Sequence, residues 1–175
     1  MRAAALLLTG AVLTAGCLQA GTGSRLEVTS TAVTDGGTIP STYTCDGANH
    51  HPPITVSGVP DDAVTLAITV EDMDVSFHHW LAWNIPANTT QIEAGELPAV
   101  AEEGPNSYSN TPMAEHPTTG YAGPCPPNGM EHTYRFTVYA VDTSFNVSDR
   151  DAVMDALESH TLATGSLQAT YRRTR

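Results

Sequence analysis

Apolar residues in this chain recur at every second position, in short runs separated by turn-forming residues. Leu66, Ile68 and Val70 alternate with smaller or more polar neighbours. The same spacing returns in two later runs, which are Tyr134, Phe136, Val138 and Leu167, Ala169, Tyr171. A period of two is typical of β-strands, and the first run predicts a strand with one buried face.

Two other segments depart from this alternation. Residues 80–85 are apolar almost throughout, which predicts a strand covered on both faces. Residues 102–129 are rich in Gly and Pro and are long for a loop in a compact domain. Because this segment also contains Tyr108, Met113 and Tyr121, we expect an ordered loop that helps to form a site.

A single helix is indicated near the C-terminus. Ser148 is the expected N-cap, with Asp149 and Asp151 in the first turn, where the helix dipole favours negative charge. The face that this helix buries is predicted to carry Val153, Leu157 and His160. We therefore interpret His160 as a packed, hydrogen-bonded helix residue and not as a ligand.

The order of these elements predicts the fold class. Turn residues are frequent between the strands, as at residues 35–37, 46–47 and 126–129. A mainly β fold follows, an antiparallel β-sandwich with one or two small helices, and not a parallel α/β fold. A length of 175 residues suits one domain.

The N-terminus carries an export signal. Its apolar stretch, residues 3–12, is too short to span a bilayer comfortably, and it leads into Leu-Thr-Ala-Gly-Cys17, which resembles a lipobox. We expect residues 1–16 to be a signal peptide, residues 17–24 to be a lipidated Cys17 with its tether, and residues 25–175 to form the domain. The protein would then be exported and anchored to the outer face of the cell membrane. Cleavage without lipidation is the alternative.

The charge balance excludes some partners. The chain has 19 Asp and Glu against 7 Lys and Arg, a formal net charge of −12, and all of its basic residues are Arg. Nucleic acid and an anionic membrane surface would be repelled. Such acidity without Lys indicates a halophilic protein, since concentrated salt screens self-repulsion. An ordinary acidic secreted protein is the alternative.

Two cysteines remain once Cys17 is assigned to the anchor. In an exported protein, Cys45 and Cys125 suggest a disulfide, with two separate thiols as the alternative. Their spacing does not favour a zinc site.

Three polar clusters carry the candidate chemistry: residues 71–74, 77–80 and 123–134. If the strands before and after residue 74 pair as a tight hairpin, Asp72 and His79 come close together. An Asp that accepts a hydrogen bond from one ring nitrogen would fix the tautomer and direct the other nitrogen at a ligand. Each cluster taken alone is better explained without a site, as a solvated strand end, a strand edge or a turn.

Taken in order, the clusters resemble the phosphatidylethanolamine-binding protein (PEBP) family, and within it the bacterial and archaeal branch called Raf-kinase-inhibitor-like. The motifs are Asp72-Met73-Asp74, His79-Trp80 with Asn84-Ile85-Pro86, Gly120-Tyr121-Ala122-Gly123-Pro124-Cys125-Pro126-Pro127 and His132-x-Tyr134. An earlier stretch, residues 43–49 with Pro52-Pro53, is also similar to this branch. The resemblance covers about residues 26–172.

This resemblance implies a sandwich of two antiparallel sheets with a small cavity for phosphate-like or other small anions. The implied ligand-binding residues are Asp72, His79, Gly123, Cys125, Pro126, Pro127, His132 and Tyr134, with Asp46 nearby. Three positions depart from the family pattern. Met73 replaces the Pro of Asp-Pro-Asp, Ser76 replaces a second Pro, and Thr133 replaces an Arg.

We expect a binding protein for a small anionic ligand or a phospholipid head group, with no catalytic residue, no cofactor and no metal. The alternative enzyme is a weak hydrolase that uses Asp72, His79 and His132. A second alternative is zinc held by histidines from the pairs at residues 50–51 and 78–79 together with His132. Since neighbouring strand residues point to opposite faces, each pair would supply one ligand at most.

Overall fold

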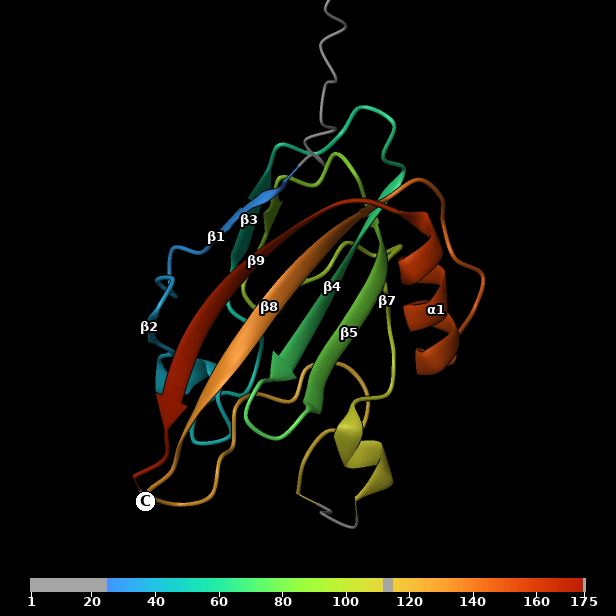
Figure 1. Ribbon diagram of the computed structural model, residues 1–175. Helices are drawn as coiled ribbons and strands as arrows, with labels where there is room; N and C mark the ends of the chain where they lie inside the picture. Colours follow the sequence, from blue (N-terminus) through green and yellow to red (C-terminus); the bar gives the residue numbers. More distant parts are fainter. Residues whose placement is uncertain (1–24, 112–114, 175) are drawn as a thin grey trace, which may run out of the picture.

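The strand predicted at Leu66 lies inside a six-stranded sheet in the computed structural model, which describes residues 25–111 and 115–174 (Figure 1). In spatial order this large sheet contains β2 (Gly37–Thr38), β9 (Thr161–Arg172), β8 (Glu131–Val141), β4 (Thr65–Asp72), β5 (Phe77–Pro86) and β7 (Glu102–Glu103). A small sheet contains β1 (Glu27–Thr29), β3 (Ile54–Ser57) and β6 (Gln91–Ile92). All strand pairs are antiparallel except β2 with β9, and the predicted mainly β sandwich is confirmed.

The main core lies between the two sheets. Leu66, Ile68 and Val70 of β4 face this core, where they join Phe136 and Val138 of β8. The small sheet contributes Val28, Ile54, Val56 and Ile92. Because β4 and β8 pair with Ile68 opposite Val138, their alternating apolar residues share one face, as the period of two predicted.

The prediction that β4 is half-buried is wrong. Its outward residues Thr65, Ala67 and Thr69 are also buried. A second apolar cluster explains this difference, because Ala67 packs there with residues of β5 and of the helix. The other members are Leu81, Trp83, Val141, Phe145, Val153 and Leu157. Strand β5 is covered on both faces between Trp80 and Trp83, as its apolar run predicted.

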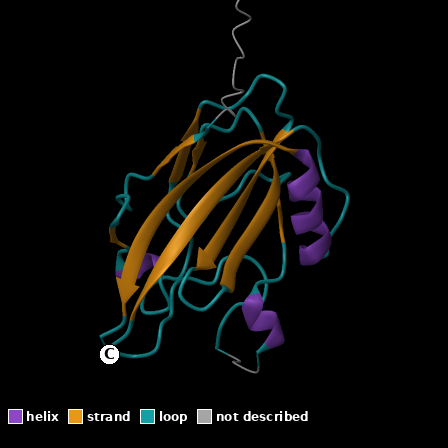
Figure 2. Ribbon diagram, viewed as in Figure 1, coloured by secondary structure: helices purple, strands orange, loops and turns teal. Residues whose placement is uncertain are grey.

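Helix α1 (Arg150–His160) forms a third layer against the outer face of the large sheet (Figure 2). Its N-cap is Asp149 and not Ser148, because the Asp149 carboxylate accepts hydrogen bonds from the backbone N–H groups of Asp151 and Ala152. His160 is hydrogen-bonded, as predicted, through its Nδ1 to Asp142 at 2.8 Å. The imidazole is exposed, however, and does not pack into the core.

The remaining segments are connected by two short 3₁₀ helices and one disulfide. The 3₁₀ helices are η1 (Ser41–Tyr43) and η2 (Ser107–Asn110), and η2 lies in the long Gly/Pro-rich loop. In that loop Tyr108 and Tyr121 are buried, while Met113 lies outside the described residues. Cys45 and Cys125 form the disulfide that the sequence suggested.

The signal peptide expected at residues 1–16 and the lipidated Cys17 also lie outside the described residues. Within residues 25–111 and 115–174, the helices are too short or too polar to cross a bilayer.

Candidate functional site

A cavity of about 360 Å³ opens at the end of the large sheet where β4 and β9 end and β5 and β8 begin (Figure 1). Six of the residues expected at a ligand site line it: Asp72, His79, Cys125, Pro126, Pro127 and His132. The folded chain therefore gathers residues from the ends of three strands and from one loop. The two other expected residues, Gly123 and Tyr134, do not line the cavity.

Asp72 and His132 form a buried pair. Asp72 is directly opposite Tyr134 in the β4–β8 register, so His132, two residues before Tyr134, projects from the same face of the sheet. The His132 Nδ1 lies 2.6 Å from Asp72 Oδ2, and the other carboxylate oxygen accepts from the Asp74 N–H. Because a carboxylate can only accept, Nδ1 of His132 carries a proton, and its Nε2 is the ring nitrogen left for a ligand.

His79 reaches the cavity through a β-bulge. In the β4–β5 pair, Val70 is opposite Trp80 while Glu71 is opposite His78, which leaves His79 as an extra residue. A bulge changes the direction of a side chain relative to regular alternation. As a result both His79 and Trp80 are buried on the inner side of the sheet, while His78 pairs with Glu71.

Asp72 and His79 lie close together at the same cavity, but they do not hydrogen-bond to each other. The Nδ1 of His79 instead donates to the backbone carbonyl of Ala122 at 2.6 Å, and Asp72 is already bonded to His132. Burial lowers the pKa of His79 to about 4, against the opposing effects of the Ala122 carbonyl and the Asp72 charge. The His79 imidazole is therefore neutral at pH 7, with Nε2 as an acceptor.

Tyr134 lies beneath the cavity and is fully buried. Its ring is edge-on to His79, with ring centroids 5.3 Å apart, and its hydroxyl has no well-formed hydrogen bond among the described residues. Burial, together with the nearby Asp72 carboxylate, raises the pKa of the Tyr134 phenol. The phenol is therefore neutral at pH 7, and its ring packs against His79.

Gly123 holds the Gly-Pro-Cys-Pro-Pro turn against the early part of the domain. A Cβ at this position would collide with the Tyr43 carbonyl oxygen, so a larger residue does not fit. The Gly123 N–H donates to Asn49 Oδ1 at 2.8 Å, and the disulfide of Cys125 lies two residues further on. These contacts fix the loop that places Pro126 and Pro127 at the cavity.

The sequence analysis missed the cation of this site, Arg173. It lines the cavity, and its Nε donates to Asp46 Oδ1 at 3.3 Å. Asp46 also accepts from the Tyr171 hydroxyl, at 2.7 Å. The alternation of β9 contained the signal, because Tyr171 is opposite His132 and Arg173 follows two residues later.

The analysis also missed the apolar and aromatic wall, which consists of Val75, Phe77, Tyr108 and His116. The His116 ring stacks on Tyr108 with ring centroids 4.3 Å apart. Nothing in the loop sequence distinguishes these residues from their neighbours. The cavity thus combines one guanidinium, three imidazoles and the Asp72 carboxylate with a largely apolar wall, which suits a small anion attached to an apolar group.

The histidines proposed as zinc ligands are not gathered. His51 stacks on Trp80 with centroids 4.5 Å apart, and His78 pairs with Glu71 on the opposite face from His79. Across residues 25–111 and 115–174, no three His, Cys, Asp or Glu side chains converge as a metal site.

A second, larger hollow of about 750 Å³ lies on the outer face of the large sheet. It contains none of the residues expected at the ligand site. We therefore assign the family-like chemistry to the smaller cavity, where the histidines lie.

Comparisons with known proteins agree with the mainly β fold. Residues 29–172 match the family model described as phosphatidylethanolamine-binding protein. A UPF0098 protein of Methanothermobacter thermautotrophicus is 39% identical over 153 residues, which cover 81% of this chain and 95% of that protein. The crystal structure of E. coli YbcL, described as a new member of the mammalian PEBP family, has a TM-score of 0.73 and 28% identity. The match covers 85% of this chain and 98% of YbcL.

One relative bears a name that concerns location. A Mycobacterium tuberculosis protein named "Putative lipoprotein LppC" is 37% identical over 118 residues, which cover 65% of this chain and 54% of that protein. The names of these relatives do not describe an enzyme activity.

Proposed function

Because this chain belongs to the phosphatidylethanolamine-binding protein family, we propose that its cavity binds a small anionic ligand through His79, His132 and Arg173. The observation that carries the proposal is the arrangement of the two imidazoles. Each Nδ1 is held by an acceptor inside the protein, so the two Nε2 atoms are left for a ligand beside Arg173. The three groups come from β5, from β8 and from the residue that follows β9, and they share one cavity.

The protonation of these groups supports a phosphate monoester in its singly protonated form. Arg173 is always charged and can donate to ligand oxygens. Neutral His79 can accept a hydrogen bond from a P–OH group, which a fully ionised anion lacks. The wall of Phe77, Tyr108 and Pro127 can contact a short apolar substituent. Both free phosphate and a phospholipid head group offer this chemistry.

A titration separates these two sources. Inorganic phosphate and O-phosphoethanolamine are added to the full chain while the imidazole NMR signals of His79 and His132 are followed. We expect saturable shifts with both, and tighter binding of O-phosphoethanolamine if a head group is the natural ligand. The expected variant effect is a loss of about tenfold in affinity in Arg173→Gln, because a charge-assisted contact is removed.

The neighbouring Arg172 provides a matched control. It pairs with Glu131 at the surface and does not line the cavity. Arg172→Gln removes the same charge and should leave the affinity unchanged. Equal losses in the two variants would show non-specific attraction of anions and would overturn the proposed site.

The hydrolase alternative is tested by comparing the native chain with His132→Ala. Neutral His79 and the His132–Asp72 pair have the composition of a base with an oriented partner. Turnover of 4-nitrophenyl phosphate that disappears in His132→Ala would replace the binding function by catalysis. We expect no turnover.

We also propose that the protein is lipid-anchored at Cys17 and faces the outside of the membrane. The lipobox-like ending of the N-terminal segment and the name of the related LppC support this location. Labelled fatty acid should be incorporated into the native chain and not into Cys17→Ser. Native protein that incorporates no labelled fatty acid and partitions into the aqueous phase would contradict the anchor.

A further inference from the structure

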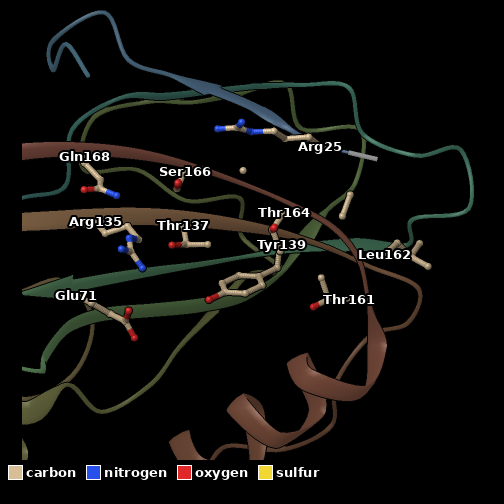
Figure 3. A pocket seen from close by; sticks show the side chains of 12 residues that line it. Arg25, Glu71, Arg135, Thr137, Tyr139, Thr161, Leu162, Thr164, Ser166 and Gln168 are labelled. Atoms are coloured by element: carbon tan, nitrogen blue, oxygen red, sulfur yellow. The ribbon is translucent and has the colours of Figure 1, made fainter. Parts of the chain in front are cut away.

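The larger hollow forms a groove on the outer face of the large sheet, on the side opposite to Asp72 and His132 (Figure 3). Its floor is made by β8 and β9, and the start of β9 beside α1 closes one end. Figure 3 shows Arg25 and Arg135 on either side of Ser166, with Tyr139 nearer the helix. The proposed anion site and the groove share no lining residue, so an inference about the groove stands apart from the proposed function.

The sheet register explains why the groove floor is polar. Directly opposed residues on β8 and β9 project from the same face, and their pairs are Arg135 with Gln168, Thr137 with Ser166 and Tyr139 with Thr164. Each of these six side chains carries a hydrogen-bonding group. Glu71 of β4 is opposite Arg135, so the Arg135–Gln168 pair continues onto a third strand. The floor is therefore a regular array of guanidinium, amide, hydroxyl and phenol groups.

The groove is locally cationic in an acidic protein. Two arginines line it against one glutamate, whereas the whole chain has a net charge of −12. Arg25 makes no side-chain hydrogen bond or ion pair within the described part of the chain. Glu71 is close both to His78, at 3.2 Å, and to Arg135, whose positive charge helps to lower the pKa of the Glu71 carboxyl. The array thus presents the unused charge of Arg25 next to neutral hydroxyls.

Two adjoining hollows lengthen the groove. One, of about 430 Å³, shares Tyr139, Thr161 and Thr164 with the groove and continues along α1. The other, of about 340 Å³, shares Arg25, Ser166 and Gln168 and continues to Asp35. Acidic side chains lie at both outer ends, with Asp155 and Glu158 at the first and Asp35 at the second. The shape and charge fit an elongated ligand with its negative charge in the middle and neutral polar groups on both sides.

We propose that this groove binds a short acidic oligosaccharide, with one carboxylate between Arg25 and Arg135. Guanidinium groups bind carboxylates in a two-point geometry, and the hydroxyl and amide side chains can pair with sugar hydroxyls. The half-buried ring of Tyr139 offers an apolar surface to one sugar face.

An acidic peptide fits the groove less well. A peptide adds to a sheet through unpaired backbone groups at a strand edge, but β8 is paired on both sides, with β4 and β9. Saccharide chemistry therefore accounts for the array better than peptide chemistry.

The test uses the full chain with a trisaccharide that has one glucuronic acid between two glucose units as the probe and maltotriose as a neutral sugar of equal length. We expect saturable shifts in the backbone NMR signals of Thr137, Tyr139 and Ser166. The acidic trisaccharide should bind about tenfold more tightly than maltotriose because of its charge-assisted contacts. Arg135→Gln should weaken binding of the acidic trisaccharide by about fivefold, and Thr137→Val by about threefold with little change in side-chain shape.

Arg150 supplies the matched control, because it pairs with Asp151 on α1 and does not line the groove. Arg150→Gln should bind as tightly as the native chain. Loss of affinity in Arg150→Gln equal to that in Arg135→Gln would overturn the proposal, as would equal affinity for the two sugars. Tighter binding of a Glu-rich hexapeptide at the same signals would assign the groove to a peptide and would also overturn it.

Discussion

The two histidines of the anion site hold their rings in different ways, although both come from similar motifs. The Nδ1 of His132 pairs with the Asp72 carboxylate, whereas His79 donates to an uncharged carbonyl and is enclosed by Phe77, Tyr108 and Tyr134. Burial therefore lowers the pKa of His79 to about 4. At neutral pH the Nε2 of His79 is consequently a hydrogen-bond acceptor.

The neutral state of His79 predicts that the preference of the cavity for one anion over another depends on pH. Sulfate has no proton to donate at pH 7, so it cannot pair with neutral His79, whereas singly protonated phosphate can. We expect phosphate to bind about tenfold more tightly than sulfate near pH 7. As the pH falls toward 4, His79 takes up a proton with the bound sulfate, and sulfate affinity should rise by up to about tenfold per pH unit.

Calorimetric titrations at several pH values measure this effect. His160→Gln, which removes an exposed histidine elsewhere, should keep the pH dependence. His79→Gln should lose it, because the amide donates at every pH. A native sulfate affinity that is constant from pH 7 to pH 4.5 would disprove the role given to His79.

At the scale of single elements, the β4–β5 hairpin is the unit that builds the site. Its bulge turns His79 inward, and its turn at residues 73–76 returns the chain within four residues. Ser76 has φ of 50°, in the left-handed region. Proline cannot adopt this angle, so the Pro that the related family pattern has at this position is incompatible with the turn seen here.

The Ser76 conformation predicts opposite effects for two substitutions. Ser76→Gly should raise the free energy of unfolding by about 0.5–1 kcal/mol, because Gly removes the strain of a positive φ and loses some of that gain as chain entropy. Ser76→Pro should lower it by more than about 1 kcal/mol. Urea unfolding followed by tryptophan fluorescence measures both.

Ser144 gives the control for this prediction, since it is exposed and does not have a positive φ. Ser144→Gly should be neutral or slightly destabilising. If Ser76→Gly were no more stable than Ser144→Gly, the strain assigned to the turn would be wrong.

At the scale of the whole molecule, the disulfide connects two distant loops that both reach the anion site. Cys45 precedes Asp46, which holds Arg173, and Cys125 itself lines the cavity. The bond joins residues 80 positions apart. It therefore couples the stability of the fold to the shape of the cavity.

Removing the disulfide should weaken both properties. We expect Cys45→Ser with Cys125→Ser to lower the free energy of unfolding by about 2–4 kcal/mol, because the unfolded chain regains the entropy of an open loop. The melting temperature should fall by roughly 5–15 °C. Phosphate affinity should fall as well, since the disulfide no longer fixes Arg173 and the Pro126-Pro127 turn relative to each other.

Calorimetry and the phosphate titration test this on the native and double-variant proteins. A reducing agent should shift the native protein toward the variant and leave the variant unchanged. An unchanged melting temperature in the variant would contradict the coupling. The expected adaptation to high salt stays a prediction, which rests on the charge of the whole chain.

Local chemistry made several features predictable from the sequence alone. The period of two in β4 and β8 reports directly which residues face the core, because side chains alternate along a strand. The ordered motifs identified the family and six of the residues that line the cavity, since each motif keeps its polar residues at fixed spacing. The two cysteines left in a chain expected to be exported likewise suggested the disulfide.

Only the tertiary structure decided which of these groups meet. The partner of Asp72 is His132, because the strand register sets this pair and a bulge turns His79 toward Ala122. The outer face of β4 is buried because α1, which starts nearly 80 residues later, packs against it. Arg173 reaches the cavity because β9 lies beside β8. These contacts depend on how distant segments pair and pack, and local spacing in the chain carries no information about that choice.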